Sequence, residues 1–359
     1  MVNICNLVYV HVGKNLPEYF YDSLYQTLLV NHYGVKIFIL VDQECVSVVR
    51  ARIDKFNINN YFSNCSFYYN NLINIIPLNV LDTCFLEKEK SFQKYQSILQ
   101  DKYSNIGEFR DGFWVTTTMR FFYLQAFMNI FQMENCFHIE NDIMMYESFN
   151  DIMNDVYQEH GVKYTLTKIW MVQDSPQRVV PSLLFVPNQN CIDNLTEFIG
   201  ETLEASPYFV NDMDILGRFP DKLVLRIIPK ESGYSIVYDG AAIGQYVGGI
   251  DNRNNNTSIS TVGFINETSV FKPDTCEFSR RSVKTDEHIV PIKTLVGLSK
   301  QSRQLFSVAN AHVHCKELYK FSSVFDLSKE DLISGDKILT LCDFVITTRD
   351  ILMKNIQQL

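Results

Sequence analysis

The sequence predicts an α/β protein whose mostly parallel sheet is flanked by helices. Two apolar, β-rich runs at residues 4–12 and 35–41 enclose a helical stretch, the pattern of a parallel βαβ unit that is covered on both faces. Strand-sized and helix-sized segments alternate again in the second half of the chain. With 359 residues, 46% of them hydrophobic and 20% charged, the chain suits one large α/β domain or two closely packed halves.

The first half continues with further strands and helices. The strand 4–12 is followed by a turn at 14–17 and a helix to about residue 32, and the strand 35–41 by a helix at 43–55. Next come β-rich runs at 66–69 and 73–78, a polar stretch at 86–111 that is mobile or helical, a helix at 113–132 and a strand at 136–139. The helix 113–132 is almost entirely apolar, so we expect it to be largely buried.

The second half alternates in the same way. The expected strands are 164–171, 183–186, 224–229, 261–264 and 305–315. The expected helices are 191–204 and 211–218, with a Gly- and Ala-rich turn and helix at 238–249 and an Asn-rich loop at 251–258. In the absence of repeats and linkers, we expect a single compact body. It would consist of a nucleotide-binding half (1–160), an acceptor-binding half (161–322) and a mostly helical tail (323–359).

Charge and cysteine content limit the partners and the compartment. The formal net charge of -9 repels phosphate backbones, so no nucleic-acid partner is expected. Residues 1–10 have the pattern of a strand rather than a signal peptide, and no apolar run reaches the roughly 18 residues of a membrane span. Nine scattered cysteines without a CxxC pair are typical of reduced thiols. We therefore expect a cytoplasmic protein.

The Asn- and Ile-rich composition suggests an AT-rich genome such as that of a large DNA virus, in which case the compartment is the host cytoplasm.

Polar residues follow the first two strands. His11 and Asp42 lie at the carboxyl ends of these strands, which is the edge where parallel sheets bind ligands. Both are therefore candidates for contacts with a bound nucleotide.

An acidic triplet follows the buried strand 136–139. Glu140, Asn141 and Asp142 stand between apolar residues on both sides. Polar side chains in such a place are costly without partners. A divalent cation with oxygen ligands would satisfy them, and carboxylates suit Mg²⁺ or Mn²⁺. Such an ion can bridge the phosphates of a nucleoside diphosphate and stabilise it as a leaving group. The alternative is a solvated turn at a strand end, because a bare ExD is frequent by chance.

Residues 113–142 resemble the nucleotide-sugar-binding half of GT-A-fold glycosyltransferases. In that superfamily a helix that carries an arginine precedes the strand ending in the DxD or ExD motif, and here Arg120 lies twenty residues before Glu140. The resemblance implies a Rossmann-type sheet whose opening βαβ unit holds the nucleoside. It also implies a nucleoside-diphosphate sugar as donor, with a UDP-sugar expected.

The same resemblance implies roles for individual residues. Asp142 would be the direct metal ligand and Glu140 would support it, directly or through water. Asn141 would reach the ribose, while Arg120 and Thr117 would lie at the donor sugar or diphosphate. The alternative for Arg120 is a salt bridge on the helix surface, but its nearly all-apolar helix favours an internal partner.

The run 311–316 is a second candidate site. In a strand, His312, His314 and Lys316 point to one face, where they would suit a diphosphate and its cation. GT-A enzymes often carry a late histidine as metal ligand and a nearby lysine on the diphosphate. This H-x-H-x-K pattern resembles that arrangement but lacks the Gly and Pro of the H-x-x-G-x-x-K-P version. The resemblance implies Lys316 on the diphosphate and His314 on the metal, with His312 as the other candidate. The alternative is an exposed amphipathic strand.

Three aspartates are candidates for the catalytic carboxylate. Asp212 and Asp214 open the helix 211–218, which resembles an acid-rich helix start that contacts the donor sugar in some GT-A enzymes. An Asp at this place is also a common helix cap. Asp239 begins the Gly- and Ala-rich stretch, where small residues permit close approach of a ligand. An inverting transferase needs such a base near the acceptor oxygen, and the sequence does not choose among the three.

These features together predict a metal-dependent hexosyl- or pentosyltransferase. It would move a sugar from a nucleoside-diphosphate sugar to a hydroxyl of a glycan, protein or small-molecule acceptor. One alternative is a nucleotidyltransferase, which needs a basic Gly-rich loop near the N-terminus, where this chain has only Lys14. Another is a non-catalytic glycan-binding or scaffold protein of the same fold. No G-x-G-x-x-G follows the first strand and no Walker A motif is present, which disfavours a dehydrogenase or a P-loop enzyme.

Overall fold

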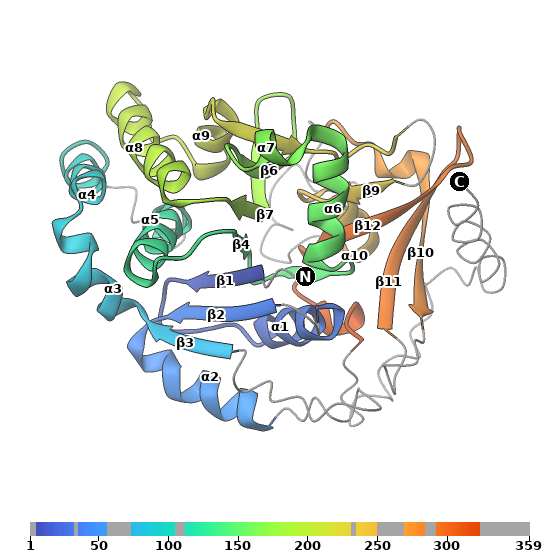
Figure 1. The fold of residues 1–359 in the computed structure, drawn as a ribbon, viewed down its shortest axis with the longest axis horizontal. Coiled ribbons are helices and arrows are strands. Elements are labelled where there is room, and N and C mark those ends of the chain that lie inside the picture. Colours follow the sequence, from blue (N-terminus) through green and yellow to red (C-terminus); the bar gives the residue numbers. More distant parts are fainter. Residues whose placement is uncertain are drawn as a thin grey trace.

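The computed structural model describes residues 5–31, 35–55, 73–104, 112–230, 235–249, 269–283 and 292–323. A large sheet lies at its centre (Figure 1). In spatial order its strands are β3 (Ile73–Pro77), β2 (Val35–Val41), β1 (Cys5–His11), β4 (Cys136–Ile139), β7 (Val179–Val186), β6 (Ile169–Gln173) and β8 (Lys222–Leu225). The first four are parallel, β7 is antiparallel to both β4 and β6, and β8 is parallel to β6.

Helices cover both faces of this sheet. One face packs on α1 (Tyr19–Val30), α2 (Gln43–Lys55) and α6 (Phe149–His160). The other packs on α3 (Leu78–Cys84), α4 (Lys90–Lys102), α5 (Phe113–Phe131), α8 (Gln189–Ala205) and α9 (Asp212–Arg218). Alternate residues of β1 enter opposite cores: Leu7 and Tyr9 face the first group, and Val8 and Val10 the second. This burial on both faces is the reason that the strands are almost continuously apolar.

A second, smaller sheet lies to one side of the large one, opposite α3, α4, α5 and α8 (Figure 1). Its strands are β10 (Cys276–Val283), β11 (Ile292–Ser299), β12 (Leu305–His312) and β5 (Ile143–Met145), all antiparallel, with β9 (Ile236–Tyr238) parallel to β12. The helix α10 (Ala242–Gly248) packs on this sheet within a third hydrophobic core. Because β5 follows β4 after three residues, the chain passes directly from the large sheet to the small one.

This architecture confirms the predicted α/β class with a mostly parallel sheet between helices. The opening βαβ unit, α2, β3, α5, β4, α8 and α9 lie where the sequence predicts them, and 86–111 is helical over α4. The buried helix α5 ends as Gln132 adopts φ 52°. None of the helices in the described ranges is long and apolar enough to cross a membrane. The seven cysteines in those ranges are all free thiols.

Several predicted boundaries are wrong. The strand expected at 164–171 begins at Ile169, because the preceding residues form the short helix α7 (Val162–Thr165) with Val162 exposed. β7 begins at Val179, four residues before the predicted strand. The strand expected at 224–229 is β8, which ends at Leu225, before the exposed Ile228. In each case, pairing with a neighbouring strand sets the boundary, and the sequence does not display this pairing.

The second sheet was largely missed by the sequence prediction. β5 and β9 have only three residues each, which is too short for a recognisable strand pattern. β10 carries charged residues such as Glu277 and Arg280, so its sequence does not resemble a buried strand. α6 was also not predicted. The strand expected at 305–315 ends at His312, because the chain turns directly after Val313, where the Lys316 N–H donates to the Val313 carbonyl. The segments expected at 66–69, 251–258, 261–264 and 324–359 lie outside the described residues.

Candidate functional site

The acidic triplet forms the direct connection from β4 of the large sheet to β5 of the small sheet. Glu140 follows β4, and its carbonyl accepts a hydrogen bond from the Ile143 N–H at 3.3 Å, which closes a turn onto β5. The Asp142 carbonyl accepts from the Val313 N–H at 2.9 Å, just beyond the end of β12. The two carboxylates are therefore held at the carboxyl end of a parallel strand and beside the last residue of a strand in the other sheet.

Glu140, Asp142 and His312 each offer a ligand atom, and the three atoms lie within 4.8 Å of one another. His312 Nε2 is 3.1 Å from Asp142 Oδ2, and His312 Nδ1 is 2.7 Å from the Gly240 carbonyl oxygen. An Nδ1–H that donates to this carbonyl leaves Nε2 as the atom that can bind a metal once it has lost its proton, the usual arrangement of a ligating histidine. Glu140 Oε2 is buried and makes no hydrogen bond. These donors fit a hard divalent cation such as Mg²⁺ or Mn²⁺.

Two cationic side chains neutralise the same carboxylates. Arg120, from the middle of α5, places Nη1 2.5 Å from Glu140 Oε1 and Nη2 2.7 Å from Asp212 Oδ2. The Lys316 ammonium contacts Asp142 Oδ2. The expected internal partner of Arg120 is therefore present, and it is a pair of carboxylates. Burial alone would lower the pKa of Arg120, but Glu140 and Asp212 together raise it above its usual value.

The electrostatics of the cluster favour ionised carboxylates. Burial alone would raise the pKa of Asp142, but His312 and Lys316 hold it well below its usual range. Burial likewise opposes ionisation of Glu140, yet Arg120 and His312 lower its pKa. Burial also disfavours a charged His312, but Asp142 and Glu140 outweigh this effect and raise its pKa to about 9. The cluster therefore attracts positive charge strongly, and each carboxylate already has a positive partner.

Asp239 fixes the position of His312. Its Oδ1 accepts from the Ile243 N–H at 2.9 Å, and its Oδ2 accepts from the Gly244 N–H at 2.7 Å and the His312 N–H at 3.0 Å. Gly244 approaches β12 so closely that a Cβ there would lie 1.8 Å from the His312 carbonyl oxygen. The start of α10 and the end of β12 are thus locked together through one buried carboxylate. The close approach of small residues expected at 238–249 is made to protein backbone.

Asn141 extends the site towards the ends of β1 and β2. Its Nδ2 lies 3.0 Å from His11 Nδ1, and Asp42 Oδ2 accepts from the Gly13 N–H at 3.0 Å. Asn141 Oδ1 and His11 Nε2 are buried without hydrogen-bond partners. Burial lowers the pKa of His11, and the charge of Asp42 only partly opposes this. Two buried polar atoms without partners therefore lie beside the acidic cluster.

His314, Lys316 and Thr117 were also predicted as site residues, and the structure places them differently from one another. The three-residue group in the described part of the chain includes His312 and not His314, although the two imidazole rings lie only 4.8 Å apart. His314 and Lys316 lie in a turn, so the one-face pattern expected of a strand over 312–316 is wrong. Thr117 Oγ1 donates to the Trp114 carbonyl within α5.

Asp212 and Asp214 differ in surroundings. Asp212 is buried, and besides Arg120 its carboxylate accepts from the Met213 N–H at 3.0 Å. Asp214 is more exposed, and its Oδ1 lies 3.6 Å from Arg178 Nε. The expectation that an aspartate caps this helix is wrong, because the cap is Asn211, whose Oδ1 accepts from the Asp214 N–H. Sequence reasoning also missed Arg178, an isolated arginine with no motif around it.

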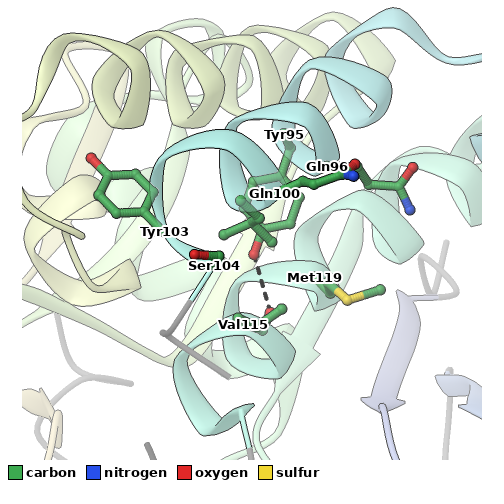
Figure 2. Close-up of a pocket in the computed structure, with 8 residues that line it drawn as sticks. Tyr95, Gln96, Gln100, Tyr103, Ser104, Val115 and Met119 are labelled. Atoms are coloured by element: carbon green, nitrogen blue, oxygen red, sulfur yellow. Dashed lines mark hydrogen bonds between the residues drawn. The ribbon is translucent and has the colours of Figure 1, made fainter. Parts of the chain in front are cut away.

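A surface hollow of about 480 Å³ lies elsewhere, between α4 and the start of α5 (Figure 2). The Tyr95 hydroxyl donates across it to the Val115 carbonyl at 3.3 Å. Tyr103, Gln96 and Met119 are among the other residues that line it. None of the predicted site residues takes part in this hollow.

No family model and no curated protein matches the sequence. Solved structures do match the fold. Mouse xyloside xylosyltransferase 1 in its apo form is 10% identical, with a TM-score of 0.42 over 65% of this chain and 87% of that one. The galactosyltransferase LgtC with donor and acceptor sugar analogues is 9% identical, with a TM-score of 0.40 over 62% and 73%. The glycosyltransferase GlyE of Streptococcus pneumoniae is 11% identical, with a TM-score of 0.35 over 62% and 45%.

Proposed function

We propose that this chain is a divalent-cation-dependent glycosyltransferase that moves a sugar from a nucleoside-diphosphate sugar to an acceptor hydroxyl. The observation that carries the proposal is the convergence of Glu140, Asp142 and His312 at the carboxyl end of β4. Three donor atoms of suitable chemistry meet there beside the polar ends of β1 and β2, where sheets of this kind bind nucleotides. Mn²⁺ or Mg²⁺ held by these residues would neutralise the diphosphate leaving group.

The protein side chains have separate roles in this proposal. Asn141 and His11, which have buried polar atoms without partners, take the ribose and base of the nucleoside, and Asp42 holds the adjoining loop through Gly13. Arg120 keeps Glu140 oriented and, with Asp212, forms the wall next to the donor sugar. A UDP-sugar is the donor that we test first. Thr117 and His314 stay candidates for contacts with the diphosphate and its cation.

The acceptor hydroxyl needs a carboxylate oxygen that it can reach. Asp239 directs its oxygens at three backbone N–H groups, and Asp212 is engaged by Arg120. The Asp214 side chain is 36% exposed, which makes it the most accessible of the three aspartates predicted as catalytic. We therefore propose Asp214 for the acceptor side, and Asp212 and Asp239 as positioning residues. A glycan, a protein hydroxyl or a small molecule would each meet this requirement.

The rival functions make different demands. A nucleotidyltransferase would need basic residues in the loop after β1, where Lys14 is exposed and lies 3.7 Å from Glu44. A non-catalytic glycan-binding protein would not need a cation for nucleotide binding. The cation dependence of nucleotide binding is therefore the first property to measure.

The test starts with thermal stabilisation by UDP, GDP or CDP, with and without Mn²⁺, and continues with hydrolysis of the matching nucleotide sugars. We expect one nucleoside diphosphate to stabilise the protein only with Mn²⁺. Asp142→Asn should abolish this shift and lower hydrolysis at least about 100-fold, since even outer partners of a metal ligand typically cost 10–100-fold.

Asp221→Asn is the matched control. It makes the same chemical change at an exposed carboxylate that pairs with Lys168, remote from the triplet along the chain, and should leave both readouts unchanged. The proposal fails if no nucleoside diphosphate gives a Mn²⁺-dependent shift, or if Asp142→Asn and Asp221→Asn behave alike.

A further inference from the structure

Lys316 has an unusual conformation. It follows β12 in a turn closed by its own N–H, which donates to the Val313 carbonyl at 3.1 Å. Its φ of 62° falls in the left-handed region, which residues other than glycine seldom adopt. This conformation directs the ammonium onto Asp142 Oδ2. The same oxygen lies 3.1 Å from His312 Nε2, so Lys316 sits on one of the donor pairs that a divalent cation requires.

Lys316 and a divalent cation therefore compete for one oxygen. Two positive charges within a few ångströms of each other repel strongly at a buried site, where the effective dielectric constant is low. A cation bound between Asp142 and His312 would force the ammonium away. Arg120 presents no such conflict, because it contacts Glu140 through Oε1 and leaves the buried Oε2 without a hydrogen bond.

Lys316 is also less enclosed than Arg120. Its side chain is 24% exposed, compared with 10% for Arg120, and in the described part of the chain Asp142 is its one carboxylate partner. A lysine ammonium is a compact charge on a flexible four-carbon stem, unlike the rigid fork of arginine. The Tyr19 ring, whose centroid is 5.7 Å from Nζ, already makes a cation–π contact with the ammonium, which does not depend on Asp142.

We propose that Lys316 is an exchangeable counter-ion of the metal site. It neutralises Asp142 in the metal-free protein, yields that oxygen to the divalent cation, and is then available to the diphosphate of the nucleotide. The inference rests on the proposed function of the site. It has a thermodynamic consequence: the cation binds weakly alone and tightly with a nucleoside diphosphate, because only the second case gives Lys316 a new anionic partner. By linkage, Mn²⁺ strengthens nucleotide binding by the same factor.

The experiment measures Mn²⁺ binding to the nucleotide-free protein by calorimetry and by the electron paramagnetic resonance signal of free Mn²⁺. Lys316→Met keeps the apolar stem and removes the charge. We expect it to bind Mn²⁺ on the order of tenfold more tightly than the wild type, because a charge-assisted hydrogen bond no longer has to be broken. With UDP added, the wild type should gain Mn²⁺ affinity, and Lys316→Met should gain about tenfold less.

Lys320→Met is the matched control. Lys320 lies four residues further on, is 48% exposed and pairs with Glu317, so its loss changes the net charge equally without touching Asp142. Its Mn²⁺ affinity should stay within about twofold of the wild type, the size expected for an exposed charge. Lys316→Arg, which keeps the positive charge, should bind Mn²⁺ no more tightly than the wild type, and it tests the idea even if Lys316→Met unfolds.

Two results would overturn the proposal that Lys316 and the divalent cation exchange at Asp142. One is unchanged or weaker Mn²⁺ binding by Lys316→Met, and the other is an equal gain in Lys320→Met, which would indicate a general charge effect. A different result, no Mn²⁺ binding by the wild type or by Lys316→Met with or without UDP, would overturn the proposed metal site itself. The two failures are therefore distinguishable.

Discussion

Arg120 is the residue on which the arrangement of carboxylates depends most. It is buried, and it donates to Glu140 on one side and to Asp212 on the other. Without it, two carboxylates would remain in a poorly solvated place, one from the end of β4 and one from the start of α9. Removing one partner of a buried ion pair is far more costly than losing an exposed one.

Arg120→Met should therefore destabilise the protein by about 3–5 kcal/mol, the range for a buried charge left without its partner. Urea unfolding followed by circular dichroism gives this free energy. The double variant Arg120→Met with Asp212→Asn should recover part of the loss, since a neutral amide replaces one stranded charge. A loss below about 1 kcal/mol for the single variant, typical of a surface pair, would contradict the view that Arg120 holds Glu140 and Asp212 as buried ion pairs.

The acids could be predicted from the sequence because they are local. Glu140 and Asp142 follow an apolar strand, and that pattern is complete within ten residues. Which of His312 and His314 lies beside the two acids could not be predicted, because it depends on where β12 ends. His312 pairs with Ile143 of β5, 169 positions earlier in the chain, and no pattern around 305–316 contains that information.

Among the elements, α10 and β12 form the contact on which the site relies. The start of α10 places two backbone N–H groups on Asp239, which also accepts from His312. Gly244 allows the helix to approach the backbone of His312. The predicted Gly- and Ala-rich turn and helix is thus confirmed as an element, and β12 lies within the predicted strand 305–315. The contact between the two became visible only in the structure.

Gly244→Ala should displace β12 and cost about 1–3 kcal/mol, the usual effect of overpacking a tight contact. It should also weaken Mn²⁺ binding, because His312 moves relative to Asp142. Thermal unfolding and calorimetry measure the two effects.

Gly200→Ala in α8 is the matched control for this substitution. Its Cβ would meet only the flexible side chain of Lys94, at 3.4 Å, and alanine in a helix interior should leave stability unchanged or raise it by up to about 1 kcal/mol. Equal effects of the two substitutions would rule out the close backbone contact as the cause.

At the scale of the whole molecule, strands from distant parts of the sequence meet in each of the two sheets. β5, from the first half of the sequence, pairs with β12, from the second half, and β4 pairs with β7. Each sheet therefore contains strands from both of the predicted halves, 1–160 and 161–322. The functional division between these halves stays a prediction. The fold class could be predicted because apolar strand patterns specify a covered parallel sheet. Of the second sheet only β12 could be predicted, because β5 and β9 are short and β10 is charged.

A cation bound by Glu140, Asp142 and His312 should therefore stabilise both sheets together. At a Mn²⁺ concentration 100 times the dissociation constant, the gain should be about 2.7 kcal/mol. Hydrogen exchange should slow in β4 and in β12 alike, and a chelator should reverse both changes. Protection confined to one sheet would contradict a cation held between them, and Asp142→Asn should show no change in either.

The distance along the chain between the carboxylates and the imidazole also sets an order in time. His312 is synthesised 170 residues after Asp142. At 5–20 residues per second, the growing chain carries its acidic triplet for roughly 9–34 s before the histidine exists. During that interval Arg120 is already present, whereas Lys316 and His312 are not. The proposed cation site is therefore complete only after β12 has been synthesised, and a nascent chain interrupted before β12 has the large sheet's acids without the histidine.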